Sequence, residues 1–104
     1  MKKITGAITA IVTPFTKNGE VDVKSLRSLV KFQLSGKIDG IVACGSTGEA
    51  ATLNDAEYQL VVKTVAQETH GKILVIAGAG SNDTKKAIHL SKLAKDAGAK
   101  ALLH

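Results

Sequence analysis

The chain has 104 residues, 44% of them hydrophobic, and a mean hydropathy of +0.11, which suffices for the core of one small domain and argues against disorder. Its formal net charge of +5 comes from 14 lysine and arginine residues against 9 aspartate and glutamate residues, and only one of the basic residues, Arg27, is an arginine. Because proteins that bind nucleic acids favour arginine and aromatic side chains, and this chain has few aromatic residues, we expect no nucleic-acid partner.

Signals for a cellular compartment are few. Cys44 is the only cysteine, so the chain cannot form an internal disulfide. The residues after Met1 contain no apolar signal segment, and no apolar run approaches the length that spans a membrane. We therefore expect a cytoplasmic protein with no membrane partner.

Four short apolar runs predict the strands of a sheet. They cover Ala7 to Val12, Gly40 to Cys44, Ile73 to Ala77, and Ala101 to Leu103. These runs are almost continuously apolar rather than alternating, which is typical of parallel strands that are covered on both faces. Their spacing is roughly thirty residues, the length of a strand–helix–strand unit.

Amphipathic segments between these runs predict three helices. The expected N-caps are Asp22, Asn54 with its partner Glu57, and either Asn82 or Asp83, and glycines 36, 71 and 98 follow the helices. The inward faces are expected to carry Leu26, Leu29, Val30 and Leu34, then Tyr58, Val61, Val62 and Val65, then Ala87, Leu90, Leu93, Ala94 and Ala97. The prediction is one α/β unit over residues 1–104, in the order β-α-β-α-β-α-β, with no second domain.

A glycine- and hydroxyl-rich turn follows the second predicted strand. The segment from Gly45 to Ala50 reads Gly-Ser-Thr-Gly-Glu-Ala. Ligands of parallel α/β sheets bind beyond the carboxyl ends of the strands, where this turn lies. Glycines let a ligand approach backbone N–H groups closely, so the turn is suited to a small carboxylate. The loops after the first and third strands, at Thr13 to Phe15 and Gly78 to Asn82, lie at the same edge, although glycine geometry and helix capping also explain their composition.

These segments together carry a family resemblance. Residues 45–49, with Ala-Thr-Leu at 51–53, Thr-Pro-Phe at 13–15, Val-Ile-Ala-Gly at 75–78, and Asn82 with Thr84, resemble the dihydrodipicolinate synthase family of pyruvate-dependent class I aldolases. The resemblance implies a (β/α)8 TIM barrel of which this chain is only the N-terminal half, about four strands and three helices. It also implies a homo-oligomer, a tetramer in the full-length family, with no cofactor and no metal. Because the last predicted strand would leave an unpaired parallel edge, we expect a fragment.

The resemblance also implies a reaction. A lysine on the sixth strand forms a Schiff base with pyruvate, and the resulting enamine attacks aspartate 4-semialdehyde, which gives 4-hydroxy-tetrahydrodipicolinate for lysine and diaminopimelate biosynthesis. By position, Ser46 is the proton-relay hydroxyl, Thr47 binds the pyruvate carboxylate, and Gly48 lies at the substrate. No lysine here falls at the carboxyl end of a predicted strand, so we expect this lyase chain to be inactive alone.

Some positions depart from the family pattern. Most synthases have threonine at position 46, whereas N-acetylneuraminate lyases of the same superfamily favour Ser-Thr-Gly-Glu-Ala, so that activity stays an alternative. A non-enzymatic βα-repeat module that pairs with a partner is another. Asn82 matches the family's lysine-effector site, but Asp55, Tyr58 and Lys86 do not, so weak or absent inhibition by lysine is expected.

Two residue types are expected to play no catalytic role. Cys44 follows an apolar run with no histidine near it in the sequence, which favours a buried hydrophobic residue over a nucleophile. The three histidines, at positions 70, 89 and 104, have no metal-ligand spacing.

Overall fold

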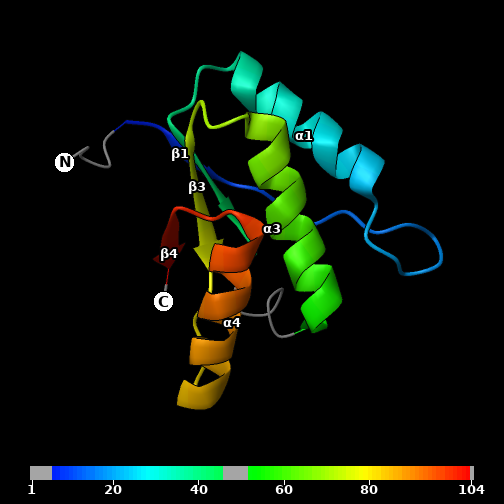
Figure 1. The fold of residues 1–104 in the computed structure, drawn as a ribbon. Coiled ribbons are helices and arrows are strands. Elements are labelled where there is room, and N and C mark those ends of the chain that lie inside the picture. The colour runs from blue at the N-terminus through cyan, green and yellow to red at the C-terminus, as the bar shows by residue number, and fades with distance from the viewer. Residues whose placement is uncertain (1–5, 46–51, 104) are drawn as a thin grey trace.

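The fold is one parallel sheet with three helices. The computed structural model describes residues 6–45 and 52–103. Its strands are β1 (Ile8–Ala10), β2 (Gly40–Ala43), β3 (Leu74–Gly78) and β4 (Ala101–Leu103), and its helices are α1 (Val23–Ser35), α3 (Asp55–Thr69) and α4 (Thr84–Ala97). The sheet order is β1-β2-β3-β4, and every pairing is parallel (Figure 1). The predicted alternation of strands and helices is confirmed in the described residues.

Local hydrogen bonds at the helix ends follow from the capping residues. The Asp22 carboxylate accepts from Ser25 N at 3.0 Å, which begins α1. Asn54 and Glu57 form a reciprocal capping box, with N···O distances of 2.8 and 2.9 Å. Asp83, not Asn82, caps α4 and accepts from Lys85 N at 2.9 Å. The predicted caps of the first two helices are confirmed, and the choice left open for the third is settled.

The helices cover one face of the sheet. Consecutive strands are neighbours in the sheet, and right-handed crossovers between such strands place every connecting helix on the same side. Helix α3 packs against both α1 and α4 and so lies in the middle of the helix layer (Figure 1). The core between the layers includes Leu26, Val30, Ile41, Tyr58, Val61, Val62, Val65, Val75, Leu90 and Ala94. The predicted inward faces of the helices are therefore confirmed, except that Ala87 lies outside this core and lines a groove beside β4.

The opposite face of the sheet has no helix over it in the described part of the chain. Val42 and Ile76 are buried by their neighbours in the sheet but do not belong to the core under the helices. On the edge strands this face is open: Ile8 is 39% exposed, and Leu103 is 50% exposed. Strands β1 and β4 each pair with one described strand, and the expectation that all four strands are covered on both faces stays a prediction.

The ends of three strands differ from the prediction. Strand β1 covers three residues rather than Ala7 to Val12, and Ile11 continues its register through a 3.0 Å bond to Val42 O. Strand β2 ends at Ala43, because Cys44 has a left-handed φ of 56° that breaks the extended backbone. Strand β3 starts one residue later and extends to Gly78.

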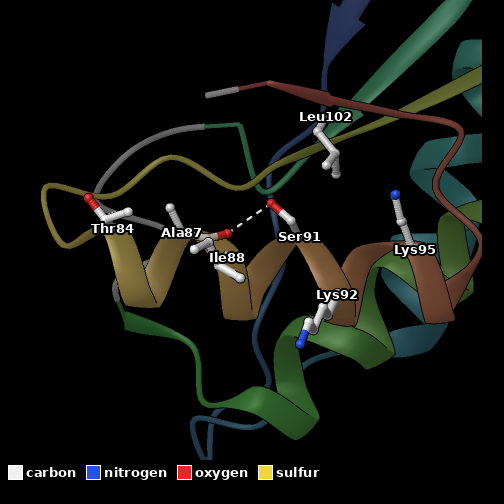
Figure 2. Close-up of a pocket in the computed structure, with 7 residues that line it drawn as sticks. All are labelled: Thr84, Ala87, Ile88, Ser91, Lys92, Lys95 and Leu102. Carbon is white, nitrogen blue, oxygen red and sulfur yellow. Dashed lines mark hydrogen bonds between the residues drawn. The ribbon is translucent and has the colours of Figure 1, made fainter.

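A groove runs between α4 and β4, where the helix layer ends. It has a volume of about 320 Å³ and is lined by Thr84, Ala87, Ile88, Ser91, Lys92, Lys95 and Leu102 (Figure 2). The α4 residues recur at intervals of three and four, so they form one stripe along the side of the helix. Ile88 in this stripe is 55% exposed, which the sequence pattern did not predict.

Candidate functional site

The carboxyl ends of the four strands lie at one edge of the sheet, as the sequence predicted. The described residues there include Thr13, which is buried, Cys44 with Gly45, and the loop from Gly78 to Asn82. Ser46, Thr47 and Gly48 lie outside the described residues, so their assigned roles stay predictions. What the structure does describe is the framework on either side of the turn that contains them.

The ends of β2 and β3 approach each other closely before this turn. A Cβ atom added to Gly78 would overlap the carbonyl oxygen of Cys44, and one added to Gly45 would lie 2.6 Å from Cγ1 of Val42. Neither position has room for a side chain, which explains both glycines. Cys44 itself is buried, as predicted for a small hydrophobic residue. The chain therefore enters the turn from a closely packed position.

Tyr58 connects α3 to this position. Its side chain is fully buried, and its hydroxyl donates a 2.7 Å hydrogen bond to the carbonyl oxygen of Gly78. Burial, with a smaller contribution from Cys44, raises the pKa of the Tyr58 phenol well above its ordinary value, so the group is neutral at physiological pH. One side chain thus fixes the end of β3, against which the last residues of β2 pack.

Sequence reasoning placed Tyr58 on an apolar helix face and at a position that departs from the lysine-effector pattern, but assigned its hydroxyl no partner. The missed signal was its chemistry: it is the only tyrosine in an otherwise aliphatic core, and a buried tyrosine hydroxyl needs a hydrogen-bond partner. The identity of that partner, 20 residues further along the chain, was not available from local pattern.

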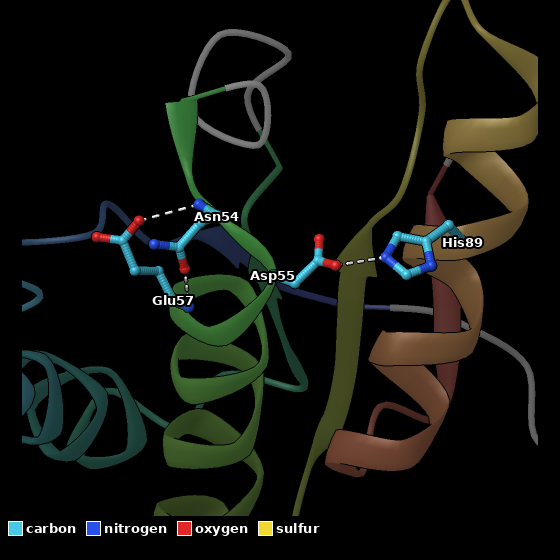
Figure 3. Close-up of polar contacts among 4 residues, drawn as sticks. All are labelled: Asn54, Asp55, Glu57 and His89. Carbon is cyan, nitrogen blue, oxygen red and sulfur yellow. Dashed lines mark hydrogen bonds and ion pairs between the residues drawn. The ribbon is translucent and has the colours of Figure 1, made fainter.

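A polar contact joins the start of α3 to the second turn of α4 (Figure 3). Nε2 of His89 lies 2.6 Å from a carboxylate oxygen of Asp55, and both side chains are more than half exposed. Asn82 and Lys86 are also exposed nearby in sequence, before and within the first turn of α4. Of the four positions associated with a lysine effector, Tyr58 is the one whose side chain is withdrawn from solvent. The role of Asn82 stays a prediction.

No described group has the setting of a Schiff-base nucleophile. All lysines in residues 6–45 and 52–103 are exposed, whereas an amine of this kind needs a desolvated position. Within the same ranges, histidine, cysteine, aspartate and glutamate side chains form no group of three or more that would hold a metal ion. None of the helices described there has the length and apolar character needed to cross a membrane.

Comparison with known proteins decides the family. Residues 3–104 match the model of the dihydrodipicolinate synthetase family. The chain belongs to this family. It is 52% identical to the 4-hydroxy-tetrahydrodipicolinate synthase of Maridesulfovibrio salexigens and 54% identical to that of Geobacter metallireducens, over 98 residues that cover 94% of this chain and 33% of each relative. The chain therefore spans about a third of the length of the curated relatives that it matches.

Solved structures of this family share the fold. The synthase of Methylacidiphilum fumariolicum SolV has a TM-score of 0.89 at 43% identity, over 96% of this chain and 33% of that one. The Acinetobacter baumannii synthase, solved as a complex with pyruvate, has a TM-score of 0.89 at 47% identity, over 96% and 34%. An N-acetylneuraminate lyase from Mycoplasma synoviae has a TM-score of 0.80 at 37% identity, over 93% and 34%. The four-stranded unit corresponds to the N-terminal part of the TIM-barrel synthases, which confirms the predicted fold class.

Proposed function

We propose that this chain is the pyruvate-binding part of a lyase that condenses pyruvate with aspartate 4-semialdehyde through a Schiff base to give 4-hydroxy-tetrahydrodipicolinate. The observation that carries the proposal is the family match over residues 3–104, which includes the whole Gly45–Ala50 turn. The Acinetobacter baumannii relative was solved with pyruvate, which supports pyruvate as the first substrate. As in the family, the activity belongs to a cytoplasmic homo-oligomer, although one similar structure is a monomeric synthase variant.

The turn residues have distinct roles in this proposal. Thr47 binds the pyruvate carboxylate through its hydroxyl and backbone N–H, and Gly48 lets the ligand approach the backbone. Ser46 passes a proton between substrate and a tyrosine supplied by another part of the barrel. Support comes from the packing at the entry to the turn, where Cys44 lies against Gly78 and Tyr58 bonds to the Gly78 carbonyl. Such pre-organisation matters because a small displacement of a binding group weakens catalysis strongly.

The nucleophilic lysine comes from outside this chain. Each lysine of the described residues is exposed, and a solvated ammonium group is a poor nucleophile at neutral pH. The 104-residue polypeptide is therefore expected to form no Schiff base by itself. It contributes carboxylate binding and proton relay to a site that a further polypeptide segment completes.

Reductive trapping tests this division of roles. Treatment with pyruvate and borohydride should leave the mass of the 104-residue chain unchanged. Addition of a polypeptide comprising the remaining two thirds of the Maridesulfovibrio salexigens synthase should produce a pyruvate adduct on the added polypeptide, together with turnover of aspartate semialdehyde. An adduct on the 104-residue chain alone, or reassembly without any adduct, would contradict the proposal.

A matched pair of variants tests the assignment of Thr47. Thr47→Val keeps the shape but removes the hydroxyl, so trapping efficiency at limiting pyruvate should fall about 10- to 100-fold, the value of one hydrogen bond to a charged group. Thr16→Val makes the same change in the loop before α1, where the hydroxyl accepts only from Glu20 N at 3.3 Å, and should leave trapping unchanged. Equal effects of both variants would refute the role of Thr47.

N-acetylneuraminate lyase activity is the second candidate. The sequence Ser-Thr-Gly-Glu-Ala at 46–50 and the similarity to the Mycoplasma synoviae lyase favour it. Assays of the reassembled protein with both substrates distinguish the synthase from the lyase. Cleavage of N-acetylneuraminate without condensation of aspartate semialdehyde would show that the protein is the lyase.

Weak or absent inhibition by lysine is also proposed. The Tyr58 hydroxyl is occupied inside the core, the Asp55 carboxylate is in contact with His89, and Lys86 adds a cation that repels the ammonium groups of lysine. Inhibition of the reassembled enzyme by sub-millimolar lysine would contradict this expectation.

A further inference from the structure

The chain passes from the predicted pyruvate-binding turn almost directly into α3. Of the described residues there, Leu53 is buried, Asn54 caps the helix, and Asp55 is its first residue. One turn later, the Tyr58 hydroxyl bonds to the carbonyl oxygen of Gly78. The start of α3 is thus attached to the core and to the end of β3.

A contact with α4 holds the same helix start from the outer side. Nε2 of His89, in the second turn of α4, lies 2.6 Å from Oδ2 of Asp55 (Figure 3). A carboxylate accepts hydrogen bonds and does not donate them, so Nε2 carries the proton of this bond. Nε2 is protonated in the imidazolium and also in one neutral tautomer. The ring therefore makes this contact in either charge state.

The contact completes a ring of three elements at the edge of the sheet where the strands end. β3 ends at Gly78, and the chain continues through a loop into α4. His89 of α4 contacts Asp55 of α3, and Tyr58 of α3 bonds back to Gly78. Glu57, the other acidic residue in the first turn of α3, points away from α4 and bonds to the backbone of its own helix start (Figure 3). Asp55 is therefore the acidic residue of this turn that reaches α4.

We propose that His89 is a positioning residue for pyruvate binding, because its contact with Asp55 holds the first turn of α3 in the arrangement that the substrate requires. This inference rests on the proposed function of the preceding turn. A site that is held in place before its ligand arrives loses less conformational freedom on binding, which raises its affinity. His89 acts through Asp55 rather than by contact with the substrate.

The expected effect of this pair is modest. The side chain of His89 is 52% exposed and that of Asp55 is 61% exposed, and exposed ion pairs are weak. Loss of such a pair should change a binding equilibrium by about 2- to 5-fold. It should therefore weaken pyruvate binding without unfolding the chain.

A second ion pair on α3 offers a matched control. Nζ of Lys31, on α1, lies 3.4 Å from a carboxylate oxygen of Glu68 in the last turn of α3. Like His89, Lys31 joins α3 to a neighbouring helix. Glu68 lies about 20 Å further along the helix than Asp55, at about 1.5 Å per residue. Lys31→Ala therefore releases the far end of α3 and should leave its start unchanged.

Reductive trapping at varied pyruvate concentrations tests the proposal in the reassembled protein. His89→Ala should raise the pyruvate concentration for half-maximal trapping about 2- to 5-fold and leave the maximal yield of adduct unchanged. A variant that merely loses stability would lower the yield instead. His89→Gln should behave as the parent does, because its side-chain amide can still donate to Asp55. In an Asp55→Ala background, His89→Ala should have no further effect.

Amide exchange of the 104-residue chain gives a readout that needs no catalysis. The amides of Glu57 and Tyr58 both bond to Asn54, so they report on the first turn of α3. His89→Ala should speed their exchange about 2- to 5-fold, whereas Lys31→Ala should not. Circular dichroism confirms that the variants are folded.

The two measurements separate this inference from the proposed function. Absence of any adduct in the reassembled parent protein would refute the proposed function, whereas unchanged exchange in His89→Ala would refute this inference alone. With an active parent, three results would each overturn the role of His89: an unchanged half-saturating concentration in His89→Ala, an equal effect of Lys31→Ala, or an undiminished effect in the Asp55→Ala background.

Discussion

Tyr58 shows how one side chain supports the neighbourhood of the candidate site. Its ring fills the core between α3 and the sheet, and its hydroxyl reaches the carbonyl oxygen of Gly78 at the end of β3. The same glycine packs directly against the backbone of Cys44, which precedes the predicted pyruvate-binding turn. Its burial was predictable from helical spacing, but its hydrogen bond was not, because the acceptor belongs to a different strand–helix unit.

Removal of this hydroxyl should destabilise the fold. Tyr58→Phe leaves the Gly78 carbonyl without its buried donor and should lower the free energy of unfolding by about 1–3 kcal/mol. Thr64→Val is the control, since the Thr64 hydroxyl bonds at 2.7 Å to the Leu60 carbonyl of its own helix and is easier to replace. Urea denaturation of both variants measures the difference. If Thr64→Val lowered the free energy of unfolding more than Tyr58→Phe does, Tyr58 would stabilise the fold only through its ring.

The raised pKa of Tyr58 gives the same variant a second readout. A phenol whose pKa is higher in the folded than in the unfolded chain stabilises the fold fully below pH about 10, and this contribution is lost as the pH rises further. Because Tyr58 is the only tyrosine, phenolate absorbance reports it alone. Phenolate should appear only as the chain unfolds, and Tyr58→Phe should lose stability less steeply above pH 10. Ionisation without unfolding would contradict the burial argument.

Helix α3 is the element on which the rest depends, since it packs against both other helices and carries Tyr58. Its start was predictable because the Asn54–Glu57 capping box is local in sequence. The apolar faces of all three helices were predictable for the same reason. The burial of individual strand residues was less predictable, because it depends on what packs beside and over a strand: β2 is buried along its whole length, whereas Leu103 in the similarly apolar β4 is half exposed among the described residues.

Loss of the α3 cap should measurably lower the free energy of unfolding. Asn54→Ala removes the acceptor for Glu57 N and should lower the free energy of unfolding by about 1 kcal/mol. Asn82→Ala is the control: Asn82 precedes the Asp83 cap and is exposed, so its replacement should change stability by less than about 0.5 kcal/mol. Thermal or urea denaturation gives both values. Equal costs would mean that the capping box contributes nothing specific.

At the scale of the whole molecule, the order of strands and helices was predictable, because the apolar runs recur at the spacing of a strand–helix–strand unit. The described helices cover one side of the sheet, and coverage of the other side stays a prediction. The candidate site likewise has a part that the structure describes and a part that rests on resemblance. Its framework is described, while Ser46, Thr47 and Gly48 rest on resemblance and await the trapping experiment.

The sheet order also has a consequence for how the chain folds during synthesis. Each strand pairs with the one before it in sequence: Gly40 with Ile8, Leu74 with Gly40, and Ala101 with Ile76. Each of these three pairings therefore joins strands that are close in sequence, which keeps the entropic cost of each step low. The β1–α1–β2 unit is complete in sequence before β3 emerges from the ribosome. The sheet thus grows by one strand at a time as the chain emerges, in the order β1, β2, β3, β4.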